Sequence, residues 1–122
     1  MLILTVASPV ALSVTAIILP RTTPAVATTV GVRQLLDEGD QLLAAEDFAG
    51  ALKAYDRAMS LDRHDVAAYY RAGVALSYLD DLEQTTTLFR WVVRYGEPDR
   101  EEVRLAREWL EAAQIPVDAS PR

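Results

Sequence analysis

The feature that most constrains the fold is a residue pattern that recurs after 34 positions. Leu35 and Tyr69 are separated by that interval, and so are Gly39 and Gly73. The same interval separates the pairs Leu42/Leu76, Phe48/Leu82, Tyr55/Phe89 and Leu61/Tyr95. A fixed period of this length is typical of stacked helical arrays. The chain is therefore predicted to carry one helical template twice.

Each copy is predicted to contain two helices joined by a short polar turn. The first helices span about residues 32–45 and 66–79, and the second helices span about 47–60 and 81–94. Aspartates stand where an N-cap carboxylate can accept hydrogen bonds from the free N–H groups of a first helical turn. These aspartates are Asp47, Asp65 and Asp81.

Two glycines fall in the middle of the first helices, at Gly39 and Gly73. A glycine inside a helix costs about 1 kcal/mol relative to alanine. Because both glycines stand at one register, a shared cause is expected. We expect close approach of the second helix, with Ala51 or Thr85 against the glycine.

This pattern resembles the tetratricopeptide repeat, a helix–turn–helix unit of 34 residues. The second helices carry the matching residues, at Ala51, Tyr55 and Ala58 in the first copy and, more loosely, at Thr85, Phe89 and Val92 in the second. The resemblance covers residues 32–99. It implies an all-α fold, a right-handed α-α superhelix of two helical hairpins.

A further helix is predicted over residues 99–114, where Asp99 and Glu102 form a capping-box pattern. Its apolar side consists of Val103, Leu105, Ala106, Trp109 and Leu110. We expect it to close the array by covering the open face of the second copy. The helical domain is thus predicted over residues 32–114, with a tail over 115–122.

The first twenty residues carry no charged side chain. Leu2 to Leu19 would form an apolar helix of about 27 Å, close to the roughly 30 Å of a hydrocarbon core. Residues 1–20 are therefore predicted to be either a signal peptide, cleaved after the small residues Ala25-Val26-Ala27, or an uncleaved membrane anchor. Residues 21–31, rich in Thr, Ala and Pro, are expected to form an extended linker.

By resemblance to the family, the first helix of each hairpin lines a concave groove that binds an extended peptide or a partner helix. The residues carried over to this groove are Arg33, Leu36, Asp40, Leu43, Ala67, Tyr70, Arg71, Val74, Ser77, Tyr78 and Arg104. Tyr70, Arg71 and Tyr78 are the strongest candidates, because tyrosine and arginine dominate interface energetics. Tyr70 has an alternative role, packing against a neighbouring helix.

Some members of the family hold the C-terminal carboxylate of a partner with Lys and Asn side chains. The corresponding places here hold Leu36, Asp40 and Arg71, so such a clamp is not expected. Trp91 is a separate candidate, because its counterpart in the first copy is Arg57, a residue expected to face solvent. It either packs under the closing helix or stays exposed on the convex side, where it would support self-association.

Composition argues against several classes of function. The net charge is −6 and no basic patch is visible, so nucleic acid is not an expected partner. The chain has no cysteine, which excludes disulfides and thiolate nucleophiles. His64 is the single histidine, so neither a catalytic triad nor a His-rich metal site can form. No enzymatic activity, cofactor or metal is predicted.

The sequence therefore predicts a non-catalytic adaptor or scaffold that binds a protein or peptide in its groove. The alternative is a structural, self-associating subunit or a membrane-tethered assembly factor that oligomerises through its convex or closing face, for example as a homodimer. The apolar leader and the eleven arginines against one lysine indicate a bacterial protein that is exported, to the periplasm or outside, or membrane-anchored. Contact with a membrane is expected only through residues 1–20, if they are not cleaved.

Overall fold

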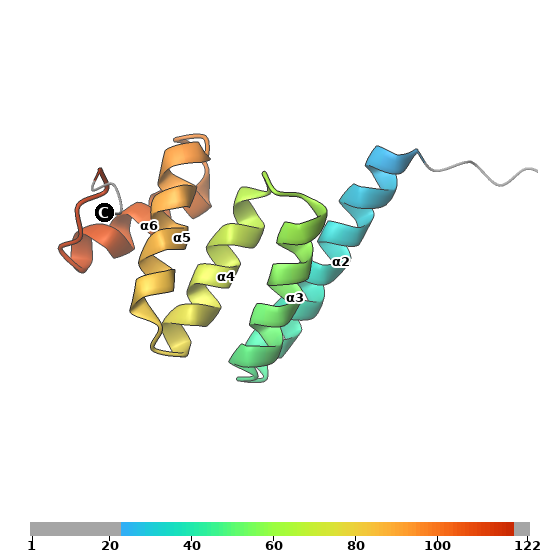
Figure 1. Ribbon diagram of the computed structural model, residues 1–122, viewed down its shortest axis with the longest axis horizontal. Helices are drawn as coiled ribbons and strands as arrows, with labels where there is room; N and C mark the ends of the chain where they lie inside the picture. Colours follow the sequence, from blue (N-terminus) through green and yellow to red (C-terminus); the bar gives the residue numbers. More distant parts are fainter. Residues whose placement is uncertain (1–22, 119–122) are drawn as a thin grey trace, which may run out of the picture.

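The computed structural model describes residues 23–118, and within this range the protein consists of helices with no strand. The helices are α2 (Pro24–Ala44), α3 (Phe48–Leu61), α4 (Val66–Tyr78), α5 (Leu82–Tyr95) and α6 (Glu101–Ala112). Each packs on the next along the chain, and α4 also contacts α6. Figure 1 shows the hairpins α2/α3 and α4/α5 beside one another, with α6 at the far end. The prediction of an all-α fold built from helical hairpins is confirmed.

The predicted N-caps of the three inner helices are confirmed. The carboxylates of Asp47, Asp65 and Asp81 accept hydrogen bonds from backbone N–H groups three residues ahead, at 2.9, 3.0 and 3.1 Å. Each bond satisfies a donor that the helix itself leaves without a partner. These caps explain why α3, α4 and α5 begin within a residue of the positions expected from the sequence.

The first helix begins earlier than expected. Residues 24–31, expected to belong to an extended linker, form the first turns of α2. Thr23 is the N-cap and its side chain accepts a hydrogen bond from the N–H of Val26 at 3.4 Å. Pro24 stands at the first helical position, where its fixed φ fits and its missing N–H costs nothing. The predicted leader over residues 1–20 lies outside the described residues, and no described helix is both long and apolar enough to cross a membrane.

The two internal glycines lie where aromatic rings press on the first helices. A Cβ atom at Gly39 would clash with the ring of Tyr55, and one at Gly73 would lie 2.5 Å from Cε1 of Phe89. The expected close approach of the second helix is confirmed, but the atoms nearest to each glycine belong to an aromatic ring and not to Ala51 or Thr85. Thr85 still contacts the second glycine, because its hydroxyl donates to the carbonyl oxygen of Gly73 at 3.4 Å. An aromatic ring is thus the reason that these positions lack a side chain.

The 34-residue period extends to a third turn. Glu46, Asp80 and Gln114 each adopt the left-handed conformation, with φ of 62°, 60° and 59°. Each is followed by the same backbone hydrogen bond, from Asp47 N to Leu42 O, from Asp81 N to Leu76 O and from Ile115 N to Leu110 O, at 2.9–3.0 Å. This pattern is a Schellman motif. Helix α6 therefore ends as α2 and α4 end, in the register of a third copy.

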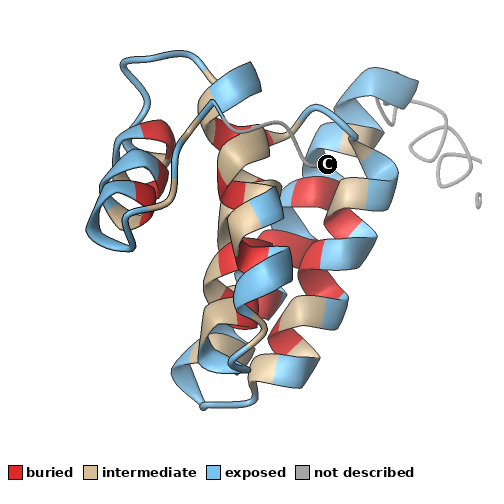
Figure 2. Ribbon diagram, turned by 60° about the vertical axis from the view of Figure 1, so that its left-hand side comes forward, coloured by how far each residue is buried: buried red, intermediate tan, exposed pale blue. Residues whose placement is uncertain are grey.

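The core falls into two clusters that share α4. The first cluster is built from α2, α3 and α4, with the buried residues Val32, Leu35, Leu36, Ala51, Tyr55, Ala58, Ala68, Ala72 and Ala75. The second cluster is built from α4, α5 and α6, with the buried residues Val66, Phe89, Val92, Val103, Ala106 and Leu110. Figure 2 shows these buried residues on the sides of the helices that face one another.

Helix α6 packs on the second cluster as the closing helix was expected to do, but its start differs from the prediction. Arg100, and not Asp99, occupies the N-cap position, and no side chain caps the helix. Glu102 instead pairs with Arg100, whose Nε lies 3.3 Å from Oε2. The capping-box prediction was therefore wrong, because residues 97–100 form a turn, closed by a hydrogen bond from Arg100 N to Glu97 O at 3.0 Å, before the helix begins.

The residues after α6 fold back onto the array. Ile115 and Val117 pack against the second cluster, and Nε of Arg90 donates a hydrogen bond to the carbonyl oxygen of Pro116 at 3.1 Å. The first part of the predicted tail, up to Val117, therefore belongs to the packed structure. Residues 119–122 lie outside the described range.

Candidate partner-binding groove

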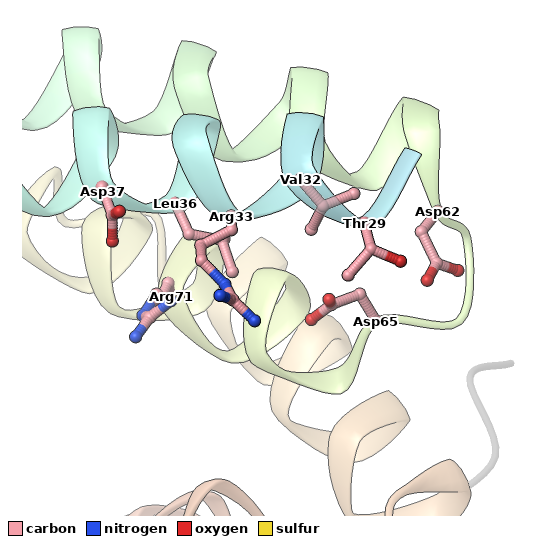
Figure 3. A pocket seen from close by; sticks show the side chains of 8 residues that line it. All are labelled: Thr29, Val32, Arg33, Leu36, Asp37, Asp62, Asp65 and Arg71. Atoms are coloured by element: carbon pink, nitrogen blue, oxygen red, sulfur yellow. The ribbon is translucent and has the colours of Figure 1, made fainter. Parts of the chain in front are cut away.

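A cavity of about 390 Å³ opens between α2 and α4, beside the loop that joins α3 to α4. Its lining consists of Thr29, Val32, Arg33, Leu36, Asp37, Asp62, Asp65 and Arg71. Val32 and Leu36 are buried and form an apolar floor, while the other six side chains are polar or charged (Figure 3). A site of this size, with an apolar base and polar groups at its edge, is typical of ligand and peptide recognition.

A hydrogen-bonded network stands next to this cavity and connects three helices. The hydroxyl of Tyr55, on α3, donates to Oδ1 of Asp40, on α2, at 2.7 Å. The same oxygen lies 3.4 Å from Nε of Arg71, on α4. Because Tyr55 is fully buried, its hydroxyl fixes the position of the Asp40 carboxylate. That carboxylate in turn fixes one edge of the Arg71 guanidinium. Both hairpins therefore contribute to the position of Arg71.

Burial raises the pKa of Tyr55 above its ordinary value, because the phenolate would lose its hydration. The hydrogen bond to Asp40 and the negative charge of that carboxylate raise the pKa further, and only the charge of Arg71 acts in the opposite direction. The phenol is therefore a stable donor to Asp40 at any physiological pH.

We expect this raised pKa to appear as a loss of stability in alkaline solution. Since the folded-state pKa lies above the unfolded value, the contribution of Tyr55 is complete below about pH 10 and is lost as the pH rises further. Urea unfolding of the wild type and of Tyr55→Phe, measured between neutral and alkaline pH, tests this. The variant should be less stable by about 1 kcal/mol at neutral pH, but should lose less stability than the wild type above about pH 10. Parallel pH curves for the two proteins would contradict it.

The charged groups around the cavity are only partly paired. In the described part of the chain, Arg33 has no carboxylate within salt-bridge distance. Arg71 is paired through Nε, which leaves the opposite edge of its guanidinium without an ion-pair partner among the described residues. Figure 3 shows the guanidinium groups of Arg33 and Arg71 below Leu36, with Asp65 on the other side of the opening. These donors remain available to a bound molecule.

The acidic side of the cavity is partly committed to local structure. One oxygen of Asp62 accepts a hydrogen bond from the N–H of His64 at 2.9 Å, and one oxygen of Asp65 caps α4. Each carboxylate keeps a second oxygen for other contacts. Five lining residues were not predicted: Thr29, Val32, Asp37, Asp62 and Asp65. Thr29 lies in the segment expected to be a linker, Val32 and Asp37 lie on α2 as a buried and an exposed residue, and Asp62 and Asp65 flank the α3–α4 loop.

Tyr70, another predicted groove residue, does not line this cavity. The ring of Tyr70 stacks on Phe89 with ring centroids 5.4 Å apart, and the side chain is half-buried. Burial raises its pKa, and the charges of Glu101 and Glu102 on α6 raise it further. Tyr70 thus packs on a neighbouring helix, as the alternative interpretation expected, while part of its surface remains accessible.

Arg104 lies on the exposed side of α6. Its guanidinium pairs with Glu108 at 2.7 Å and with Glu101 at 3.5 Å. Such exposed pairs within one helix contribute little to stability, about 0.3–0.5 kcal/mol each. Arg104 is thus held along its own helix, and no contact joins it to the Asp40–Arg71 network in the described structure.

The remaining predicted groove residues have mixed environments. Leu43 and Ala67 pack partly against the first cluster and Val74 against the second, while the Ser77 hydroxyl donates to the carbonyl oxygen of Val74 at 2.6 Å. Tyr78 is directed toward α3, where its ring stacks on Phe48 with centroids 4.5 Å apart. The structure therefore brings Arg33, Leu36 and Arg71 together in one cavity and places Tyr78 at the end of the hairpin.

Trp91 packs against the second cluster, to which α6 contributes, but its nearest aromatic partner lies on α4. Its ring stacks on Tyr69 of α4 with centroids 3.7 Å apart, and Tyr95 lies beside it at 5.1 Å. The indole is half-buried, and it is Trp109 that contacts Phe89 from α6, edge to face at 5.1 Å. Tyr69, the partner of Trp91, was recognised in the sequence only as a repeat position.

Within residues 23–118, no cluster of three or more His, Asp or Glu side chains is arranged to hold a metal ion. Compared with known proteins, the chain matches no family model, no curated protein and no solved structure.

Proposed function

We propose that the protein is a non-catalytic binding module of the tetratricopeptide type, which holds a peptide or a helix of another protein in the groove between α2, α4 and α6. The observation that carries this proposal is the cavity between the first helices of the two hairpins, with an apolar floor and two arginines at its edge. Such a surface supplies the mixture of apolar area and directed hydrogen bonds that peptide recognition requires.

The repeated geometry supports the family assignment within this proposal. Stacked copies of one hairpin should repeat the same local geometry. Here an aromatic ring covers each internal glycine, and left-handed turns recur at one register. In the proposed architecture, the hairpins twist into a right-handed superhelix whose concave side is the groove. The apolar segment over residues 1–20 then forms an N-terminal helix that exports the protein from a bacterial cytoplasm or anchors it in the membrane.

The groove is tested with peptides selected from a random library on the full chain. Arg33→Ala with Arg71→Ala should weaken binding of the selected peptides by about tenfold or more, because both donors at the cavity edge are removed. The control is Arg57→Ala with Arg94→Ala, which removes two exposed arginines from α3 and α5 and changes the net charge equally. Fluorescence anisotropy measures the affinities and circular dichroism verifies the fold. Equal affinity of both folded double variants would disprove the groove.

Self-association through the outer face is the second candidate function. Tyr95 is 62% exposed and continues the aromatic stack of Tyr69 and Trp91, so an aromatic surface is available to another copy. Light scattering on the same protein samples separates the two candidate functions. A monomer at micromolar concentration would exclude self-association and leave peptide binding in the groove.

A further inference from the structure

A second exposed surface lies at the end of the molecule where the α2–α3 and α4–α5 turns come together (Figure 1). It consists of Phe48, Tyr78, Leu79 and Leu82, and is called the turn-end patch below. Tyr78 is 59% exposed, Leu79 42% and Leu82 57%. These are three of the seven large hydrophobic side chains exposed in the described structure.

The turn-end patch is continuous across both hairpins. The rings of Phe48 and Tyr78 lie 4.5 Å apart with an interplanar angle of 7°, so α3 and α4 present one stacked aromatic surface. Leu79 and Leu82 follow Tyr78 through the next turn. Single exposed apolar residues are ordinary on a protein surface, whereas several of them gathered at one end of two hairpins are a candidate site of interaction.

The turn-end patch is surrounded by negative charge. The two turns contribute four carboxylates, at Glu46, Asp47, Asp80 and Asp81, and the first turn of α5 adds a fifth, at Glu83. No lysine, arginine or histidine occurs in residues 44–50 or 78–84. In the described part of the chain, none of these five carboxylates forms a salt bridge. Asp47 and Asp81 cap helices but keep their charge.

We propose that the turn-end patch docks a basic amphipathic segment of a partner protein, whose leucine or aromatic side chains cover the apolar centre and whose lysines or arginines face the carboxylates. Charge selects this occupant. A second copy docked through the same surface would place five carboxylates against five, and an anionic bilayer would be repelled in the same way. A neutral apolar partner would leave the surrounding carboxylates desolvated without compensation.

This surface is separate from the cavity between α2 and α4, although Tyr78 was predicted to line the groove. The cavity between α2 and α4 is lined near the α3–α4 loop, whereas the turn-end patch lies at the opposite ends of these helices (Figure 1). The inference does not depend on the proposed function, because no residue that lines the cavity belongs to the turn-end patch.

The test uses the full chain and two labelled peptides of about 14 residues, with leucines in helical spacing and either lysine or glutamate at all other positions. The lysine peptide should bind and the glutamate peptide should not. Leu82→Gln should weaken binding by about tenfold, because it removes apolar area at the centre of the contact. Glu46→Gln with Asp80→Asn should also weaken it by about tenfold, since these changes keep the shape but remove two charges.

Matched controls stand at the opposite end of the molecule. Leu61 is 50% exposed, so Leu61→Gln makes the same change to a comparable side chain. Glu97→Gln with Asp99→Asn removes the same two charges from the exposed α5–α6 loop. Both controls should change the affinity by less than about twofold, because exposed charges are screened over this distance. The variant Arg33→Ala with Arg71→Ala should also bind the lysine peptide normally, which separates this result from failure of the groove.

Each other outcome overturns the inference. If the charge variant at the turn-end patch and the control at the α5–α6 loop lost affinity equally, binding would follow net charge alone. If the glutamate peptide also bound, the carboxylates would not select the partner. Dissociation of a dimer by Leu82→Gln would assign the turn-end patch to a second copy. Weaker attachment of that variant to phosphatidylserine vesicles would assign it to a membrane.

Discussion

Replacing Phe89 with alanine is expected to lower the free energy of unfolding by about 3–5 kcal/mol. The ring is fully buried in the second cluster, where it covers Gly73, stacks on Tyr70 and meets the edge of Trp109. Its loss leaves a cavity where α4, α5 and α6 join. Because a small domain is stable by only about 5–15 kcal/mol, this single change should remove a large part of the total. Urea unfolding followed by circular dichroism measures it.

Two variants in the same helix serve as controls for Phe89→Ala. Phe89→Leu keeps most of the buried volume and should cost less than about 1.5 kcal/mol. Leu82→Ala shortens an exposed side chain and should change stability by less than about 0.5 kcal/mol. A loss in Phe89→Ala as small as that of Leu82→Ala would show that the ring does not connect the three helices.

Replacing Gly39 with alanine is expected to destabilise the protein by about 1–3 kcal/mol, although alanine favours a helix by about 1 kcal/mol. The new Cβ atom would clash with Cε1 of Tyr55 and would lie 2.7 Å from Cδ1. The Tyr55 ring cannot move away easily, because it is fully buried and its hydroxyl is bonded to Asp40. Steric overlap should therefore outweigh helix propensity, as thermal or urea unfolding will show.

The matched control is Gly31→Ala in the same helix. The nearest atom to a Cβ atom there is Cδ1 of Leu61, at 3.2 Å, and Leu61 is a half-exposed side chain that can turn aside. This variant should gain up to about 1 kcal/mol from helix propensity. The two substitutions are chemically identical, so their effects should differ in sign. A gain in both variants would mean that Tyr55 is not fixed against α2.

The fold could be predicted largely from the repeat. The spacing of Gly39 and Gly73 located the close contacts inside both hairpins, and the aspartates at 47, 65 and 81 located the helix starts. Both signals depend on local rules, the steric demand of a ring and the free N–H groups of a first turn, so they can be read without tertiary contacts.

Other parts of the fold depended on signals that compete with one another. Thr23 and Pro24 are an N-cap and a first helical residue, but their Thr- and Pro-rich surroundings resemble a linker. Asp99 and Glu102 have the spacing of a capping box, yet a turn over residues 97–100 moves the helix start past Asp99. In both cases the sequence predicted a helix but not the residue at which it begins.

The candidate site could be predicted only in part. Arg33, Leu36 and Arg71 were carried over from the resemblance to the repeat family and do line the cavity. The register could not show that the Tyr78 ring turns toward Phe48, or that Trp91 stacks on Tyr69. Such pairings are decided by side-chain directions between neighbouring helices, which a period in the sequence does not contain.

The presence of α4 in both core clusters has a consequence for cooperativity. One face of α4 packs in the first cluster through Ala68, Ala72 and Ala75, and another packs in the second through Val66. The folding of the two hairpins is therefore coupled through this helix. Neither hairpin can separate from the other without exposing a face of α4 to water. The array therefore unfolds as one unit only as long as this helix remains docked on both sides.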